Sequence, residues 1–538
     1  MLGLSTSGHV HPRRHVTVGT LGSLLIMVGS WGVGWLPSNQ LSWFAHSTIL
    51  NPLRVETSGV ISCAVAMMLG CLLLIRSWLR LGQDLRLPTL RIPPSSIVSG
   101  EPHVHARRYL SHAMIAWMAP LMLAFPIFSR DVYSYLAQGR VLHTGLNPYE
   151  HGVSSLSGWF MQGADSIWAE SPSPYGPLFL LMARGIWVVT GGVPEAAILI
   201  FRLITVSGLV LCWWAVPRLA RRFGSNQEWA LWVAVLNPLT AFYLMAGVHN
   251  DSLMTGLLLA GFLLIGAGRD RWGASTAGLV LIGVSIAIKP LTVLTLPFAG
   301  LLMLYRPGQA RVRYRHRAAA WVWCLVVVGA VMTVAGAVSG LWFGWIPAML
   351  TSGDAAFPYA PFGLLGLGFG WLVDVVLNTG LRPVADVVYT LGTAASLGLV
   401  AYLALRRRVI NPLVSTALAL TVTILLAPII QPWYVLWVIP IYAVTRVWRG
   451  TMEWQSWTVY LMVVALAVVG VIDQVSVAQW IPILLVRGII LVVGVAGMVY
   501  LVLFDRATAC LFPFRRDARQ AMRRREPPSE LTTTRESE

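Results

Sequence analysis

Charged residues are scarce in this chain of 538 residues, because Asp, Glu, Lys and Arg make up only 11% of it. A soluble domain carries about 25% charged residues, so a soluble multi-domain enzyme is excluded. The five cysteines are scattered without a CxxC pair, and neither a disulfide framework nor a zinc site is indicated. Walker, Rossmann-glycine and HExxH motifs are also absent, so no nucleotide-sugar donor is indicated.

Apolar residues are abundant instead, at 56% of the chain, and they occur in long runs. A transmembrane helix takes about 20 residues, so the sequence predicts an all-α polytopic membrane protein with about 13 to 15 transmembrane helices. The run at 175–190 is short, contains Arg184 and is interpreted as irregular. Basic residues cluster between the runs in the positive-inside pattern. The net charge of +17 therefore does not indicate nucleic-acid binding, and both termini are expected in the cytoplasm of a plasma-membrane protein.

The chain divides into three parts on this pattern. Residues 1–109 are predicted to hold a cytoplasmic tail, two transmembrane helices and a basic cytoplasmic loop. Residues 110–505 form the predicted membrane domain, and residues 506–538 are a basic tail predicted to be disordered. Two long aromatic stretches, 129–174 and 340–383, fall on the outer side, where we expect them to form a lid or platform.

Two groups of polar residues stand at the outer ends of apolar runs. Asp131 follows FPIFSR and begins DVYSYLAQGRVL, which predicts a short interfacial helix ended by a turn at GLNPY. It is interpreted as a general base or, alternatively, as a loop acid paired with a nearby arginine. His249, Asn250 and Asp251 form the second polar cluster. Ionisable residues at membrane depth indicate function, and the alternative is a helix N-cap at Asn250 or Asp251.

A solitary lysine is the sharpest signal, because Lys289 is the one lysine among 39 basic residues. It lies between two short apolar runs, where an ammonium group needs a compensating anion. A phosphate or carboxylate of the substrate is the predicted partner, with a donor phosphate favoured, and a snorkelling lysine is the alternative. Arg202, within a predicted span, is a second candidate ligand for the same phosphate, with Arg184 and Arg487 as weaker ones.

Aromatic residues accompany these charges on the predicted outer side. The candidates for acceptor or sugar binding are Tyr133, Tyr149, Trp159, Trp168 and Tyr175. The aromatic residues of QPWY, Gln431 to Tyr434, are interpreted as part of the interfacial aromatic belt rather than as a sugar platform. A base, cations and aromatic walls suit a sugar linked to a lipid phosphate, whose tail lies in the bilayer. The residues require no cofactor for this chemistry. The participation of a divalent metal stays an open alternative.

Three segments carry a resemblance to a known family. They are FSRDVYSYLAQGRVLHTGLNPYEHG, SPSPYGPLF and LNPLTAFYLMAGVHNDSLMTGLLLAG. They closely resemble the polyprenol-phosphomannose-dependent α-1,6-mannosyltransferases of mycobacteria and corynebacteria, which are integral-membrane enzymes of the GT-C class. The resemblance covers roughly residues 110–450 and implies a GT-C fold with Asp131 as the base. The apolar runs before Asp131 exceed the simplest GT-C layout, which leaves the first 100 residues without a role.

The resemblance also implies a reaction and its partners. Mannose would pass, with inversion, from polyprenyl phosphomannose to the lipid-anchored α-1,6-mannan of lipomannan and lipoarabinomannan, at the outer face of the membrane. The alternative function is a transporter or flippase of a lipid-linked saccharide. Transporters typically carry inverted repeats and a site at the midplane, whereas this sequence shows no repeat and gathers its acids at one face, which favours the enzyme.

Overall fold

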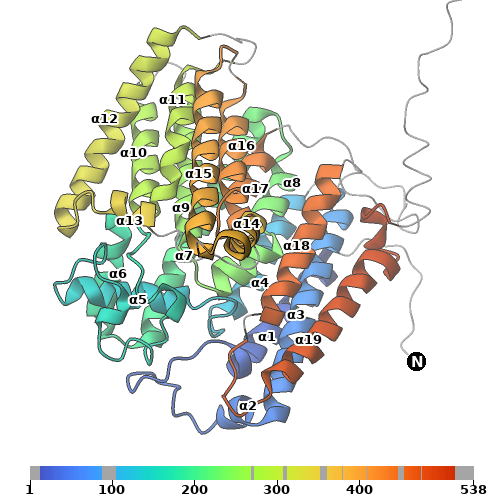
Figure 1. The fold of residues 1–538 in the computed structure, drawn as a ribbon. Helices are drawn as coiled ribbons and strands as arrows, with labels where there is room; N and C mark the ends of the chain where they lie inside the picture. The colour runs from blue at the N-terminus through green and yellow to red at the C-terminus, as the bar shows by residue number, and fades with distance from the viewer. Residues whose placement is uncertain are drawn as a thin grey trace, which may run out of the picture.

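The computed structural model describes residues 12–87, 105–267, 272–306, 312–351, 360–378, 380–408, 410–445, 454–473 and 475–514. Within these ranges every long element is a helix (Figure 1). The α-helices are α1 (Pro12–Val33), α2 (Asn51–Val55), α3 (Thr57–Asp84), α4 (Ala106–Leu121), α5 (Asp131–His143), α6 (Pro177–Thr190), α7 (Pro194–Phe223), α8 (Gln227–Ala234), α9 (Asp251–Ala267), α10 (Trp272–Ile288), α11 (Leu296–Leu304), α12 (Tyr314–Ser339), α13 (Trp345–Thr351), α14 (Pro361–Leu377), α15 (Leu381–Leu405), α16 (Pro412–Leu425), α17 (Val435–Val444), α18 (Trp454–Asp473) and α19 (Ile483–Val499).

Six helical segments of the described residues are long and apolar enough to cross a membrane: α1, α3, α7, α12, α15 and the segment Ile483–Phe504 that contains α19. A seventh candidate is a broken span, in which the π-helical turn Thr240–Ala246 meets α9 at an angle of 109°. Further apolar helices of 10–17 residues include α6, which sequence alone marks as irregular. The prediction of an all-α polytopic membrane protein is confirmed, and the count of 13 to 15 spans stays a prediction.

The N-terminal region is joined to the segment that leads into α5. Helices α1 and α3 approach closely because glycines remove side chains from their contact: a Cβ on Gly22 would lie 2.8 Å from the carbonyl oxygen of Gly70. After α1 the chain pairs with the segment that follows α4, where the Trp35 amide donates to the Pro126 carbonyl at 2.8 Å. The Tyr133 hydroxyl then donates to the Trp35 carbonyl at 2.7 Å. This region therefore buttresses the start of α5.

The first outer loop contains the predicted helix and turn. α5 begins at Asp131, and its end is followed by Gly145, whose φ of +86° suits a tight turn. The rest of the loop folds back on α5 because Arg130 donates to the carbonyls of Gly163 at 2.8 Å and Ala164 at 2.9 Å. The helix and turn predictions are confirmed, and the loop is a packed structure next to α6 (Figure 1).

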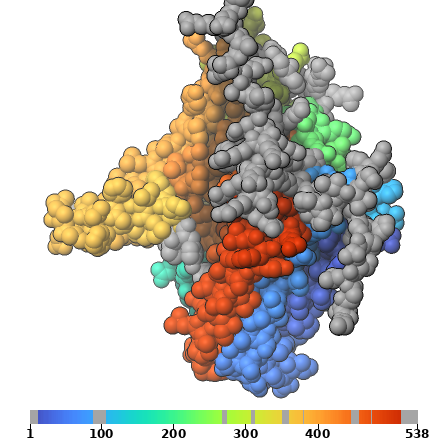
Figure 2. Space-filling model, turned by 90° about the vertical axis from the view of Figure 1, so that its right-hand side faces the viewer, coloured from blue at the N-terminus to red at the C-terminus, as the bar shows by residue number. Residues whose placement is uncertain are grey.

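The second outer stretch, 340–383, is mostly helical, with residues 352–359 and 379 outside the described part. It meets the first loop where Gly344 contacts the ring of Tyr149. Its helix α14 buries only glycines and projects from the body with the start of α15 (Figure 2). None of its described residues lines the pocket around Asp131 that is presented below. The two stretches are thus in contact at this point, and the lid role stays a prediction.

The beginning of the C-terminal tail is folded. The Gln83 amide donates to the Ala507 carbonyl at 2.8 Å, and Phe512 is fully buried. The prediction of a disordered tail from residue 506 is therefore wrong for residues 506–514, because apolar residues there pack against α3 and its neighbours. The remainder of the predicted tail lies outside the described residues.

Candidate active site

Asp131 is held at the first turn of α5 by a strained backbone. Phe128 has a φ of +63°, which is rare for a bulky residue. The Asp131 amide donates to Ser129 Oγ at 3.0 Å, and the carboxylate remains 17% exposed. Its neighbours Arg130 and Arg140 donate to backbone carbonyls of the loop rather than to Asp131. The alternative of a loop acid paired with these arginines is therefore wrong.

The second polar cluster lies at the break between the π-helical turn and α9. Val248 has a φ of +60°, a strained conformation for a β-branched residue. The next three residues, His249, Asn250 and Asp251, are buried despite their polarity. Asp251 opens α9, which agrees with its position as a helix start, but its carboxylate turns to tertiary partners instead of capping the helix. Strain on both sides of this site indicates that its geometry is imposed by the surrounding packing.

Lys289 supplies the main partner of Asp251. Its Nζ lies 2.7 Å from Asp251 Oδ1, and the indole of Trp437 donates to the same oxygen at 2.6 Å. The rings of Trp437, Tyr434 and Tyr175 lie 4.9, 5.6 and 5.9 Å from Nζ. In this structure the compensating anion of Lys289 is therefore the Asp251 carboxylate, whereas the sequence predicts a group of the substrate.

His249 stands between the two acids. Its Nδ1 lies 3.5 Å from Asp131 Oδ2 and 3.9 Å from Asp251 Oδ2, and the Tyr135 hydroxyl lies 3.4 Å away. Its ring packs on Trp433 with centroids 3.9 Å apart. Because Nδ1 carries a single hydrogen or a single lone pair, it serves one of these neighbours at a time. The imidazole therefore links the orientation of Asp131 to the Asp251–Lys289 pair.

A cavity of about 150 Å³ opens in front of these charges. At about 30 Å³ per water, it has room for a small polar group such as one sugar ring. The residues that line it are Asp131, Ser134, Gln138, Trp168, Ser171, Pro172, Pro174, Tyr175, Lys289, Ile429, Gln431, Trp433 and Tyr434. Acidic, amide, hydroxyl and aromatic groups are thus gathered around one lysine.

The predicted sugar-binding aromatics are only partly brought together. Trp168 and Tyr175 line the cavity, whereas Tyr133, Tyr149 and Trp159 do not. Tyr133 and Tyr149 donate their hydroxyls to the carbonyls of Trp35 and Tyr175, and Trp159 packs against the small core of the loop. These three residues stabilise the loop around the cavity.

The interpretation of QPWY as part of the interfacial aromatic belt is wrong. Gln431, Trp433 and Tyr434 line the cavity, and Trp433 is buried against His249. Sequence reasoning also missed Ser134 and Gln138 on α5. Their spacing of four residues places them on the same helix face as Asp131, counted at i, i+3 and i+7, which is the signal that finds them.

Arg202, on α7, does not line the Asp131 cavity. Its side chain is 2% exposed and donates to four backbone carbonyls, those of Met122, Ala124, Met245 and Ala246. Four of its five N–H donors are thereby used to join the end of α4 to the π-helical turn. This placement does not support the phosphate role predicted for Arg202. Arg184, on α6, and Arg487, on α19, also do not line the cavity.

Burial sets the proton affinity of Asp131. Loss of solvent raises the pKa of its carboxyl group to about 7, and the positive charge of Lys289 opposes part of that rise. A carboxylate with a pKa near neutrality is a stronger base than an exposed aspartate. No group of three or more His, Cys, Asp or Glu side chains in the described ranges has the geometry of a metal site.

Comparison with known proteins then gives the family. A sequence model described as alpha-(1->6)-mannopyranosyltransferase, N-terminal domain, matches residues 16–305. The chain belongs to this family. A probable alpha-(1->6)-mannopyranosyltransferase of Mycolicibacterium smegmatis is 33% identical over 79% of this chain and 78% of the relative. Alpha-(1->6)-mannopyranosyltransferase A of Mycobacterium tuberculosis is 35% identical over 78% of each.

A more distant relative agrees with this assignment: alpha-(1->6)-mannopyranosyltransferase B of Corynebacterium glutamicum is 31% identical over 78% of this chain and 71% of the relative. No solved structure matches the chain significantly. Family membership makes the protein a mannosyltransferase, which resolves the choice between enzyme and transporter in favour of the enzyme. The matched range includes Asp131, His249, Asp251 and Lys289.

The Lys289–Asp251 pair generates a prediction about folding. Lys289→Met leaves the buried Asp251 carboxylate without its counter-ion, so we expect a loss of about 3–5 kcal/mol of stability. The double variant Lys289→Met with Asp251→Asn removes both charges and should recover most of that loss. Thermal unfolding of the detergent-purified proteins measures both. A single variant as stable as the wild type would show that the pair does not support the fold.

Proposed function

We propose that this protein transfers mannose from polyprenyl phosphomannose to an α-1,6-mannan chain of lipomannan or lipoarabinomannan, at the outer face of the plasma membrane. The observation that carries the proposal is the cavity in which the Asp131 carboxylate and the Lys289 ammonium group face the same sugar-sized space. A mannosyltransferase needs a base for the acceptor and a positive charge for a leaving phosphate, and these two residues supply them.

The reaction would be a single displacement. The Asp131 carboxylate takes the proton of an acceptor hydroxyl while that oxygen attacks the anomeric carbon. The bond from this carbon to the phosphate oxygen breaks, and polyprenyl phosphate leaves. Attack on a β-linked donor from the opposite face gives an α-linked product. One base suffices for this inversion, and no covalent intermediate forms.

Lys289 would meet the leaving phosphate with the donors that Asp251 does not use. An ammonium group has three N–H donors, and one of them is taken by Asp251 Oδ1. The ion pair thus fixes the position of Nζ and leaves two donors for the phosphate. The positive charge comes from Lys289, so the proposed mechanism requires no cofactor.

Aromatic and amide side chains would hold the mannose. Trp168, Tyr175 and Tyr434 offer flat apolar faces to the sugar ring, while Gln138 and Gln431 offer donors and acceptors to its hydroxyl groups. His249 would keep the Asp131 carboxylate turned toward the acceptor, since its Nδ1 faces that carboxylate from the buried side.

The first prediction concerns the base. Asp131→Asn should lower turnover by about 10²- to 10⁴-fold, because the amide cannot accept the acceptor proton, while folding is retained. The matched control is Glu150→Gln, an exposed acid of the same loop, which should retain wild-type turnover. Transfer of labelled mannose from polyprenyl phosphomannose to short α-1,6-mannosides measures both. Near-normal turnover of Asp131→Asn would remove this residue as the base.

The second prediction concerns pH. Only the deprotonated Asp131 accepts a proton, so activity should fall about tenfold per unit as pH drops below about 7 and should level off above about 8. Hydrogen bonding to Ser129 lowers the pKa of Asp131, so Ser129→Ala should move the profile to higher pH. Transfer assays across this range test the loss of activity at low pH and the displaced profile of Ser129→Ala. A profile that is flat across it contradicts the assignment.

The third prediction concerns topology. α7 has 30 residues and is about 45 Å long, so its ends lie on opposite sides of a membrane, with the Asp131 site near its first half. In a Cys510→Ser background, Ser157→Cys should react with an impermeant thiol reagent from outside, and Arg221→Cys should react only after the membrane is opened. The reverse labelling pattern would place the site on the cytoplasmic side and overturn the proposed donor.

A further inference from the structure

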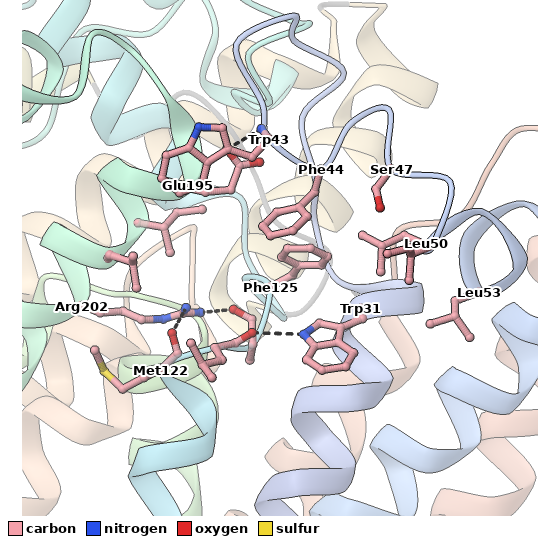
Figure 3. Close-up of a pocket in the computed structure, with 15 residues that line it drawn as sticks. Trp31, Trp43, Phe44, Ser47, Leu50, Leu53, Met122, Phe125, Glu195 and Arg202 are labelled. Atoms are coloured by element: carbon pink, nitrogen blue, oxygen red, sulfur yellow. Dashed lines mark hydrogen bonds between the residues drawn. The ribbon is translucent and has the colours of Figure 1, made fainter.

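A second cavity, of about 530 Å³, lies beside the segment that leads into Asp131 (Figure 3). Three parts of the chain enclose it: the N-terminal region from Trp31 to Leu53, the turn Met122–Phe125 after α4, and the first half of α7. The residues that line it are Trp31, Trp43, Phe44, Ser47, Ile49, Leu50, Leu53, Met122, Leu123, Ala124, Phe125, Glu195, Ile198, Leu199 and Arg202. None of them lines the Asp131 cavity, so the two sites are separate.

The wall of this cavity offers almost no free polar group. Glu195 accepts hydrogen bonds from the Ser42 hydroxyl and from the Trp43 amide, the latter at 3.1 Å. Arg202 is turned to backbone carbonyls, as Figure 3 shows for Met122. Both charged residues are therefore occupied by the protein itself, and the remaining lining is apolar except for Ser47. A hydrocarbon suits such a cavity, whereas a sugar or a phosphate would lose its hydration without compensation.

The rim of the cavity continues into the membrane-facing surface. Leu123 is 64% exposed and Leu199 is 39% exposed, and on the same helix Leu203 is 60% exposed. Apolar side chains with this exposure on a spanning helix face lipid. At the other end of the rim Trp43 is 60% exposed, which is typical of the membrane–water interface. The cavity therefore opens sideways to the bilayer close to its polar boundary.

We propose that this cavity holds one acyl chain of a bilayer phospholipid as a resident lipid. An apolar cavity of about 150 Å³ accepts benzene, so about 530 Å³ takes about 20 carbon atoms on the same scale, which suits one chain. A phospholipid fits better than the polyprenyl donor, because Lys289 is proposed to hold the donor phosphate. Lys289 lines the Asp131 cavity and does not line this one. The head group would remain at the rim near Trp43, in the interface.

The bound chain would brace the segment before the catalytic acid. The floor of the cavity is Met122–Phe125, and the chain reaches Asp131 six residues later. One side of this floor is fixed by Trp31, whose indole donates to the Leu123 carbonyl at 3.1 Å, and the other by Arg202. The lipid would fill the space between Trp31 and Arg202. The inference concerns binding and holds whatever the donor or acceptor of the reaction.

The test measures the lipid that remains on the purified protein. After exchange into a mild detergent, the wild type should retain about one phospholipid per chain, identified by mass spectrometry. Leu199→Trp, which fills the cavity from α7, should lose it, and Leu53→Phe should do the same from the opposite wall. The control Leu203→Trp, one turn along α7 and outside the cavity, should retain it. Added phospholipid should raise the melting temperature of the delipidated wild type but not of Leu199→Trp.

Three outcomes would overturn the proposal. They are no retained lipid on the wild type, equal retention by Leu199→Trp and Leu203→Trp, or recovery of polyprenyl lipid in place of phospholipid. Because binding is read without mannosyl transfer, a failure here leaves the proposed reaction standing. Conversely, an inactive protein that keeps its phospholipid would contradict the proposed reaction alone.

Discussion

The buried ion pair between Lys289 and Asp251 is the interaction on which the site depends. Asp251 opens α9 and Lys289 follows α10, so the pair fixes the ends of two helices at one point. Trp437 brings α17 to the same carboxylate. Two charges taken from water are tolerated only with such close geometry. The pair therefore determines where the lysine, the aromatic rings around it and His249 can stand, and the cavity is the space that remains between them.

Strained backbone precedes both acids of the site. Phe128 precedes Asp131 by three residues and has a left-handed conformation, and so does Val248 just before His249. Each such residue costs on the order of 1–3 kcal/mol. Neighbouring contacts hold both: Arg202 joins the two strained segments through their carbonyls, at Ala124 and Ala246. This arginine thus acts on the site through the backbone, and it explains how a charge within a span can be structural.

The sequence identifies the acids, His249 and Lys289 because ionisable residues within apolar runs are costly and therefore conspicuous. It also predicts the all-helical membrane fold and the helix that starts at Asp131. It cannot say which partner satisfies each charge: Lys289 and Asp251 are 38 positions apart, and only the fold joins them. Arg202 shows the same limit. Its partners are backbone carbonyls, which every residue carries, so the sequence cannot identify them. The sequence does not distinguish the loop aromatics from one another. Only the packing shows that Trp168 lines the cavity and that Tyr133 does not.

The region before residue 109 contacts the helix that begins at Asp131 and also lines the larger apolar cavity. It contributes Trp35, which contacts both Pro126 and Tyr133, and it contributes one wall of the larger cavity. The segment from Met122 to Asp131 therefore has the apolar cavity at its beginning and the Asp131 carboxylate at its end. Such a segment must be held firmly, because a displacement of about 1 Å in a reacting group strongly lowers turnover. The N-terminal region supplies part of that support, because Trp31 holds the Leu123 carbonyl and Trp35 pairs with Pro126.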